Sequence, residues 1–362
     1  MSEIATQRRN VVRDWLHIPT PAPAEDYGFF GPDSVTWKVW SYPTSLSIGF
    51  QRAVVIEELD PGLVAAVDRT HDIYKRPRTR YDRTLRYFAM VAFDGSAATA
   101  KAADVLVKVH SKAIGEDPVT GRRYDANDPD SQLWIHLTAW HSILKAYESF
   151  GPGRLTDAEE RQYWEECARA AEFQTIDPAA VPRTREGIRR YFEDYRPELV
   201  GSEVAQNMMD YLCDLGYHIL PERLPSWLRA ALNRPIRWAI IATMPEWIRR
   251  LGGIPQGRFA DAAARAIVRP ALRLIARRPY AELAVLDFTT PHTTPILAPA
   301  LLGVPAANPV TYTPEQARRT FGKQKPIDQY NAIRAQREIG QGPAPYTHNH
   351  HDALLEFEPS EG

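Results

Sequence analysis

The stretch AATAKAADVLVKVHSKAIG, residues 97–115, decides the fold class. Its apolar side chains recur at i, i+3 and i+4, the period of an amphipathic α-helix, and they are Ala98, Ala102, Val105, Leu106, Val109 and Ala113. His110 follows Leu106 by four residues, so it lies on the apolar stripe. Before the stretch, Gly95 is predicted in the left-handed C′ position of one helix and Ser96 as the N-cap of the next. Gly115 is predicted to end the helix.

Helical patterns also fill most of the remaining chain. They predict two helices within 45–70 that meet at Asp60-Pro61, a capping box at Thr156 and Glu159, and further helices at 80–93, 130–150, 156–173, 184–195, 201–215 and 259–276. Residues 221–255 hold several prolines and glycines, which predicts short, broken, aromatic-rich helices. Residues 289–314 are rich in proline and threonine, which predicts irregular chain. No run of period-2 strands is visible, so we expect an all-α fold with an irregular Pro-rich C-terminal segment.

The predicted domain organisation is an N-terminal arm, one helical domain and a tail. The arm covers residues 1–24, the domain residues 25–325 and the tail residues 326–362. The tail after Gly340 carries a cluster of histidines that could bind a stray divalent ion, namely His348, His350 and His351.

Composition excludes several classes of protein. With 44 basic and 45 acidic residues the net charge is −1, so no global field attracts nucleic acid. Cys167 and Cys213 have no zinc-type spacing, which favours a reducing compartment. No secretory h-region opens the chain and no apolar run reaches 18 residues, so we expect a cytoplasmic protein without a transmembrane segment. Residues 226–250 interleave tryptophans with arginines, which suits peripheral contact with anionic lipid, although such tryptophans are also common in cores.

The polar residues considered for chemistry are few, and each has a structural alternative. Arg80, Arg83 and Thr84 stand at i, i+3 and i+4, so they share one helical face, which could equally be a solvated basic face. His110 on its apolar stripe is either a metal ligand or a core histidine. His136 and His141 are five residues apart, so they cannot offer one metal the same helical face. No nucleophile elbow, P-loop or dinucleotide fingerprint is present.

An ordered set of motifs resembles the mpaB-type oxygenase family, which shares its catalytic domain with the rubber-cleaving latex clearing proteins. The resemblance spans roughly residues 28–250 and rests on Gly31-Pro32-Asp33-Ser34-Val35-Thr36-Trp37-Lys38-Val39, Arg80-x-x-Arg83-Thr84, His110-x-x-x-x-Gly115, Gly121-x-x-Tyr124-x-Ala126-x-Asp128-Pro129-x-x-x-Leu133-Trp134-Ile135-His136, Tyr163-Trp164-x-Glu166 and Val181-Pro182.

The resemblance implies a globin-like helical core that binds one haem b through a single axial histidine, which falls on His110. It places the distal Arg and Thr on Arg80 and Thr84. Where the rubber oxygenases carry a lysine this chain has Arg83, which cannot give up its proton to ligate iron. His136 matches as a cofactor-binding residue that would support the ligand or the structure and would not itself bind iron. The distal glutamate of the rubber enzymes is not placed by the sequence, where Glu57, Glu58 and Asp68 are only neighbours.

The implied function is that of a haem-dependent oxidoreductase. It would act with dioxygen on a small lipophilic substrate, with cleavage of an alkene as one reaction. The alternatives are a haem peroxidase or peroxygenase that uses hydrogen peroxide, a haem-binding sensor or carrier without turnover, and a helical interaction protein without haem. A single histidine ligand and polar distal donors are compatible with the oxygenase, with the peroxidase or peroxygenase, and with the sensor or carrier.

Overall fold

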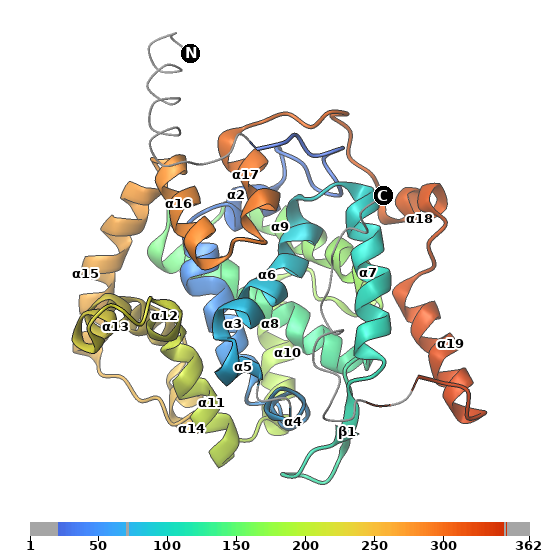
Figure 1. The fold of residues 1–362 in the computed structure, drawn as a ribbon, viewed down its shortest axis with the longest axis horizontal. Helices are drawn as coiled ribbons and strands as arrows, with labels where there is room; N and C mark the ends of the chain where they lie inside the picture. Colours follow the sequence, from blue (N-terminus) through green and yellow to red (C-terminus); the bar gives the residue numbers. More distant parts are fainter. Residues whose placement is uncertain (1–20, 70–71, 344, 346–362) are drawn as a thin grey trace.

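The computed structural model describes residues 21–69, 72–343 and 345 and is built almost entirely of helices (Figure 1). The one sheet among these residues is an antiparallel hairpin of β1 (Ile114–Glu116) and β2 (Arg123–Asp125). The prediction of an all-α fold is confirmed. Most of the predicted N-terminal arm and the three tail histidines, His348, His350 and His351, lie outside the described residues.

The core helices come from the first half of the chain. They are α2 (Val35–Trp40), the π-helix η1 (Ser45–Gly49), α3 (Phe50–Glu57), α4 (Pro61–Asp68), α5 (Asp72–Lys75), α6 (Pro77–Phe93), α7 (Ser96–His110), α8 (Pro129–Phe150) and α9 (Asp157–Ala170). The predicted break at Asp60 is confirmed, since its carboxylate caps α4 by accepting from the Leu63 amide. The capping box of Thr156 and Glu159 that opens α9 is confirmed as well.

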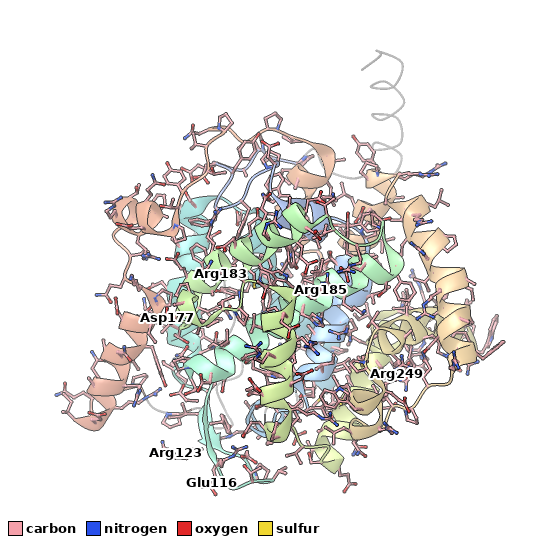
Figure 2. The ribbon with its side chains drawn as sticks, turned by 180° about the vertical axis from the view of Figure 1, so that it is seen from behind. Glu116, Arg123, Asp177, Arg183, Arg185 and Arg249 are labelled. Carbon is pink, nitrogen blue, oxygen red and sulfur yellow. The ribbon has the colours of Figure 1, made fainter. Side chains whose placement is uncertain are left out.

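The second half of the chain surrounds this core. Its helices are α10 (Arg185–Tyr195), α11 (Glu203–Cys213), α12 (Leu215–Ile219), α13 (Ser226–Ala242), α14 (Glu246–Leu251), α15 (Arg258–Ile275), α16 (Pro279–Thr289), α17 (Thr294–Leu302), α18 (Pro314–Phe321) and α19 (Pro326–Glu338). Short 3₁₀ turns lie at Ala171–Phe173, Pro178–Ala180 and Arg196–Glu198. Arg185, labelled in Figure 2, joins three helices because its guanidinium bonds to Glu148 on α8 and Glu160 on α9.

Helix α8 lies at the centre, and its side chains enter both hydrophobic clusters of the core. Leu137, Trp140 and Ile143 belong to the cluster shared with α2, α6 and α9, whereas Trp134 and Phe150 belong to the cluster shared with α3, α11 and α13. η1 passes very close to α8, because a Cβ on Gly49 would stand 2.7 Å from the Cα atom of Ile143. Glycine is therefore required there for the two helices to pack.

The structure corrects several local predictions. Gly95 has φ −61°, so it is the extended N-cap of α7 and not a left-handed C′ residue; Ser96 is the first helical residue. Helix α7 ends at His110, because the chain then turns into the β1–β2 hairpin. The predicted short helices of 221–255 are wrong over 226–242, where α13 continues through Pro235. The free energy gained by burying its inner face, which includes Ala239 and Ile240, exceeds the cost of the hydrogen bond lost at proline.

Two C-terminal stretches are more regular than predicted. The interval 289–314 contains α17, and the predicted tail 326–362 begins with α19. Both helices have proline in the first turn, where a missing amide costs nothing. Their burial explains their formation: Leu297 is fully buried against the core, and Tyr330 is buried with its hydroxyl bonded to Asp125 at 3.2 Å.

Candidate functional site

Helices α6 and α7 form an antiparallel hairpin that brings Arg80 and His110 together. Arg80 lies fourteen residues before Asp94 and His110 fifteen residues after Gly95, so both stand at the end of the hairpin away from the connection. The charge of Arg80 is close enough to lower the pKa of His110. Thr84 is one turn further along α6, about 6 Å along the axis, and its hydroxyl donates to the Arg80 carbonyl at 3.0 Å.

The rotation of α6 is fixed from its other side. Asp82 is buried, and its carboxylate accepts from the Thr293 hydroxyl at 2.7 Å and from the backbone amides of His292 and Thr293. Residues 82 and 84 are separated by about 200° around a helix, so this anchor turns Thr84 away from α17. Arg80, Arg83 and Thr84 are all half-buried.

His110 is held by Gln132 and by the Ala126 carbonyl. Its Nδ1 lies 3.2 Å from Nε2 of Gln132, and its ring also hydrogen-bonds to the Ala126 carbonyl, to which Gln132 donates at 2.5 Å. Its Nε2 makes no hydrogen bond to any residue in the described part of the chain. Burial, and then the charge of Arg80, lower the pKa of His110 to about 4, so the imidazole is neutral at physiological pH.

A chain of amide side chains joins His110 to His136. The Gln132 carbonyl oxygen accepts from Gln174 at 3.0 Å, and the Gln174 Oε1 lies 2.7 Å from Nδ1 of His136. Nε2 of His136 bonds to the Cys167 carbonyl at 2.8 Å. His136 is only 1% exposed and both of its nitrogens have protein partners, so it could bind a metal only after losing one of them.

Glu58 is a buried acid near Arg80 that the sequence did not single out from its neighbours. It is 4% exposed, and its Oε2 has no hydrogen-bond partner among the described residues. Burial raises the pKa of Glu58 to about 8, against the lowering effect of Arg80. The carboxyl is therefore mostly protonated at pH 7 and can donate a proton. The sequence could not reveal the raised pKa of Glu58, because it arises from burial in the folded protein.

A small cavity lies on the same face of α6 as Thr84. Phe88 and Val91, one and two turns beyond Thr84, line it, together with Trp140, His136 and Gln174. Its wall is mainly apolar, with the histidine and the amide as polar groups. Within the described ranges, no three His, Cys, Asp or Glu residues are grouped so that they could hold a metal ion.

Comparison with protein families gives a match that covers most of this architecture. The family model for the catalytic domain of the ER-bound oxygenase mpaB/B′ and of rubber oxygenase matches residues 37–278. The chain belongs to this family. The mpaB and rubber oxygenase match contains α3 to α15, and with them Glu58, Arg80, Thr84, His110 and His136. No curated protein and no solved structure matches the chain.

Membership confirms the resemblance first indicated by the motifs and assigns an oxygenase catalytic domain, and hence an oxidoreductase. In the part of the chain that is described, no helix is long and apolar enough to cross a membrane.

Proposed function

We propose that this protein is a haem b-dependent oxygenase that acts with dioxygen on a small lipophilic substrate, and that His110 would hold the haem iron. The observation that carries the proposal is the state of His110. It is a neutral imidazole whose Nδ1 is held by the protein and whose Nε2 is bonded to no described residue. A haem supplies four nitrogen ligands and a redox-active iron for oxygen activation, so one such histidine meets its need for a protein donor.

In this proposal the hydrogen bonds around His110 set its tautomer. The Ala126 carbonyl, which hydrogen-bonds to the His110 ring, would accept from Nδ1–H and leave the lone pair on Nε2 for a metal. Gln132 donates to the same carbonyl and so fixes its direction. In this proposal His136 does not bind iron. It holds Gln174, which holds Gln132, and its part is to orient the groups behind His110.

Three groups on and near α6 would handle oxygen and protons. The Arg80 guanidinium, and the Thr84 hydroxyl once it turns from the Arg80 carbonyl, would be donors on one face of α6, and the protonated Glu58 carboxyl would be a proton source within the electrostatic reach of Arg80. Arg83 adds positive charge but cannot cap the iron as a lysine could. The small cavity beside Phe88 and Val91 has a mainly apolar wall, so a substrate that entered next to Thr84 would meet apolar side chains.

An absorption spectrum of the purified protein tests the proposal. We expect a Soret band that shifts on reduction and again under carbon monoxide. His110→Ala should lose the band, because the only proposed protein ligand is removed. His136→Ala should keep haem in its folded fraction although it melts earlier, and the exposed His218→Ala should keep both haem and stability. A His110→Ala protein with full haem occupancy would overturn the ligand assignment.

Turnover assays separate the oxygenase from the other haem functions. Product formation that requires dioxygen supports the proposal. Turnover that occurs with hydrogen peroxide alone would identify a peroxygenase, and haem binding without turnover on any lipophilic alkene tried would favour a sensor or carrier.

A further inference from the structure

The lipid-contacting surface predicted at residues 226–250 is packed in its second half, whereas Trp227 and Leu232 near its start stay 70% and 52% exposed. Ile240, Ile241 and Ile248 are buried. Some of its arginines are paired as well, Arg237 with Asp210 and Asp214, and Arg249 with Asp261. The prediction was wrong for these residues, because α13 turns its apolar side toward α11 and α15.

Exposed apolar side chains also gather along α15, at the outer edge of the molecule (Figure 1). Phe259 is 85% exposed, Ile267 51% and Leu274 56%. They are eight and seven residues apart, so they lie on one face that extends over about 22 Å. Ala266 and Pro270 are exposed between them, and we call these five residues the α15 ridge. The opposite face of α15 is buried through Ala264, Val268 and Leu272.

A row of arginines runs beside the α15 ridge. Its members, at intervals of seven and four residues, are Arg258, Arg265, Arg269 and Arg273, and Arg277 and Arg278 follow at the end of the helix. None of the six forms an ion pair with another described residue. This contrasts with Arg237 and Arg249 nearby, whose charges are compensated.

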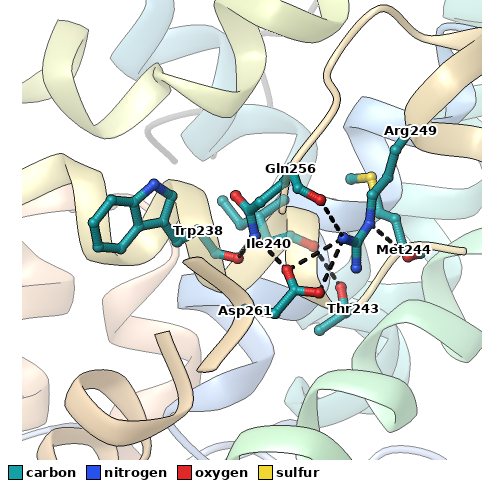
Figure 3. A network of polar contacts seen from close by, with 7 residues as sticks. All are labelled: Trp238, Ile240, Thr243, Met244, Arg249, Gln256 and Asp261. Atoms are coloured by element: carbon teal, nitrogen blue, oxygen red, sulfur yellow. Dashed lines mark hydrogen bonds and ion pairs between the residues drawn. The ribbon is translucent and has the colours of Figure 1, made fainter. Parts of the chain in front are cut away.

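The acidic residue of α15 does not offset this row. Asp261 accepts from Arg249 at 3.1 Å and from Gln256 at 2.7 Å, and Gln256 also donates to the Trp238 carbonyl (Figure 3). Arg249 further donates to the Met244 carbonyl at 2.9 Å. This network fixes the first turn of α15 to the end of α13. Because Asp261 is already paired with Arg249, the arginine row leaves the exposed surface of α15 positively charged.

We propose that the α15 ridge and its arginine row form a peripheral binding surface for anionic membranes. Apolar side chains at this spacing can enter the headgroup and acyl boundary while guanidinium groups beside them contact lipid phosphates. Contact between two copies through this face would bring arginine rows together, which is unfavourable. The proposal does not depend on haem, and it provides a route by which a lipophilic substrate could be met in the membrane.

Vesicle flotation of the full chain tests the proposal. We expect flotation with phosphatidylcholine vesicles that contain phosphatidylserine, and much weaker flotation with phosphatidylcholine alone. Binding should fall as salt is added, because exposed charges are screened. The double variant Arg265→Glu and Arg273→Glu should weaken binding by at least about 30-fold, since each basic residue near such a surface contributes roughly fivefold. The triple variant Phe259→Ser, Ile267→Ser and Leu274→Ser should abolish it.

Matched controls keep the result specific. Arg154→Glu with Arg161→Glu makes the same change of net charge at exposed arginines near and on α9, and Ile339→Ser removes an exposed apolar side chain after α19. Both should float like the wild type. Failure of the wild type to float, equal flotation with both vesicle types, or equal binding by the α15 and control variants would overturn the proposal. Light scattering that shows a dimer dissociated by the triple variant would do so too, because the ridge would then be a self-association face.

Discussion

The state of the Glu58 carboxyl can be tested through stability without any knowledge of the substrate. Glu58→Gln keeps the size and planarity of the side chain but removes its proton equilibrium. In the folded protein burial raises the pKa of Glu58 to about 8, whereas the ordinary value is 4.5. Between these two values the folded state holds a proton that the unfolded state has released. The folded state therefore loses stability as pH rises through this window.

The expected magnitude follows from this difference. A separation of about 3.5 pH units corresponds to roughly 5 kcal/mol, at about 1.4 kcal/mol per unit. The contribution of Glu58 is fully present below about pH 4.5 and is lost above about pH 8. The glutamine variant lacks this loss. It should match the wild type near pH 4.5, exceed it by roughly 3 kcal/mol at pH 7, and exceed it by roughly 5 kcal/mol at about pH 9.

Urea denaturation of both proteins at several pH values measures this difference. Glu282 supplies the matched control, since it is buried on α16 and burial raises its pKa to about 8 as well. Glu282→Gln should give a similar stability curve and leave turnover unchanged, whereas Glu58→Gln should lower turnover because the proposed proton donor is gone. A stability difference for Glu58→Gln that does not change with pH would refute the reasoning. It would mean that Arg80 keeps this carboxylate ionised.

Two further predictions concern the site and its scaffold. Thr84→Val should keep the haem spectrum but lower the turnover number by about 10²–10³-fold, as expected for loss of one positioned donor; a wild-type rate on an identified substrate would remove Thr84 from the site. Gly49→Ala should destabilise the protein by roughly 1–3 kcal/mol through overpacking against Ile143, whereas Gly257→Ala, where a Cβ meets nothing within 4 Å, should not. Melting temperatures compare the two, and equal values would show that η1 can shift away from α8.

The helical pattern was predictable because amphipathic periods and caps are local signals. The capping box at Thr156 and the break at Asp60 are each defined by a few neighbouring residues, and both were found from the sequence. The errors occurred where tertiary burial outweighed local preference. Pro235 stays inside α13 because that helix packs on the core, and Tyr330 orders α19 through its contact with Asp125.

The candidate site was only partly predictable for a similar reason. Arg80, Thr84 and His110 were predicted because they belong to short motifs, and the α6–α7 hairpin brings them to one end. Glu58 was not distinguished from Glu57, since only the fold shows which carboxyl meets the charge of Arg80. Gln132 and Gln174 were missed altogether. An amide side chain does not titrate, and these two belong to no motif that the sequence shows. Their role depends on partners that are distant in the chain, His110 for Gln132 at 22 residues and His136 for Gln174 at 38 residues.

The amide chain gives the interior a direct influence on the candidate ligand. Gln132 and His136 stand four residues apart on α8, so they lie on the same face of this helix. Gln174 follows the 3₁₀ turn after α9, and its two bonds connect them. Any tilt of α9 against α8 must therefore lengthen one of these bonds or turn Gln132 away from the Ala126 carbonyl. In the proposed site that carbonyl sets the tautomer of His110, so substitutions at Gln174 should alter metal binding at a site that they do not touch.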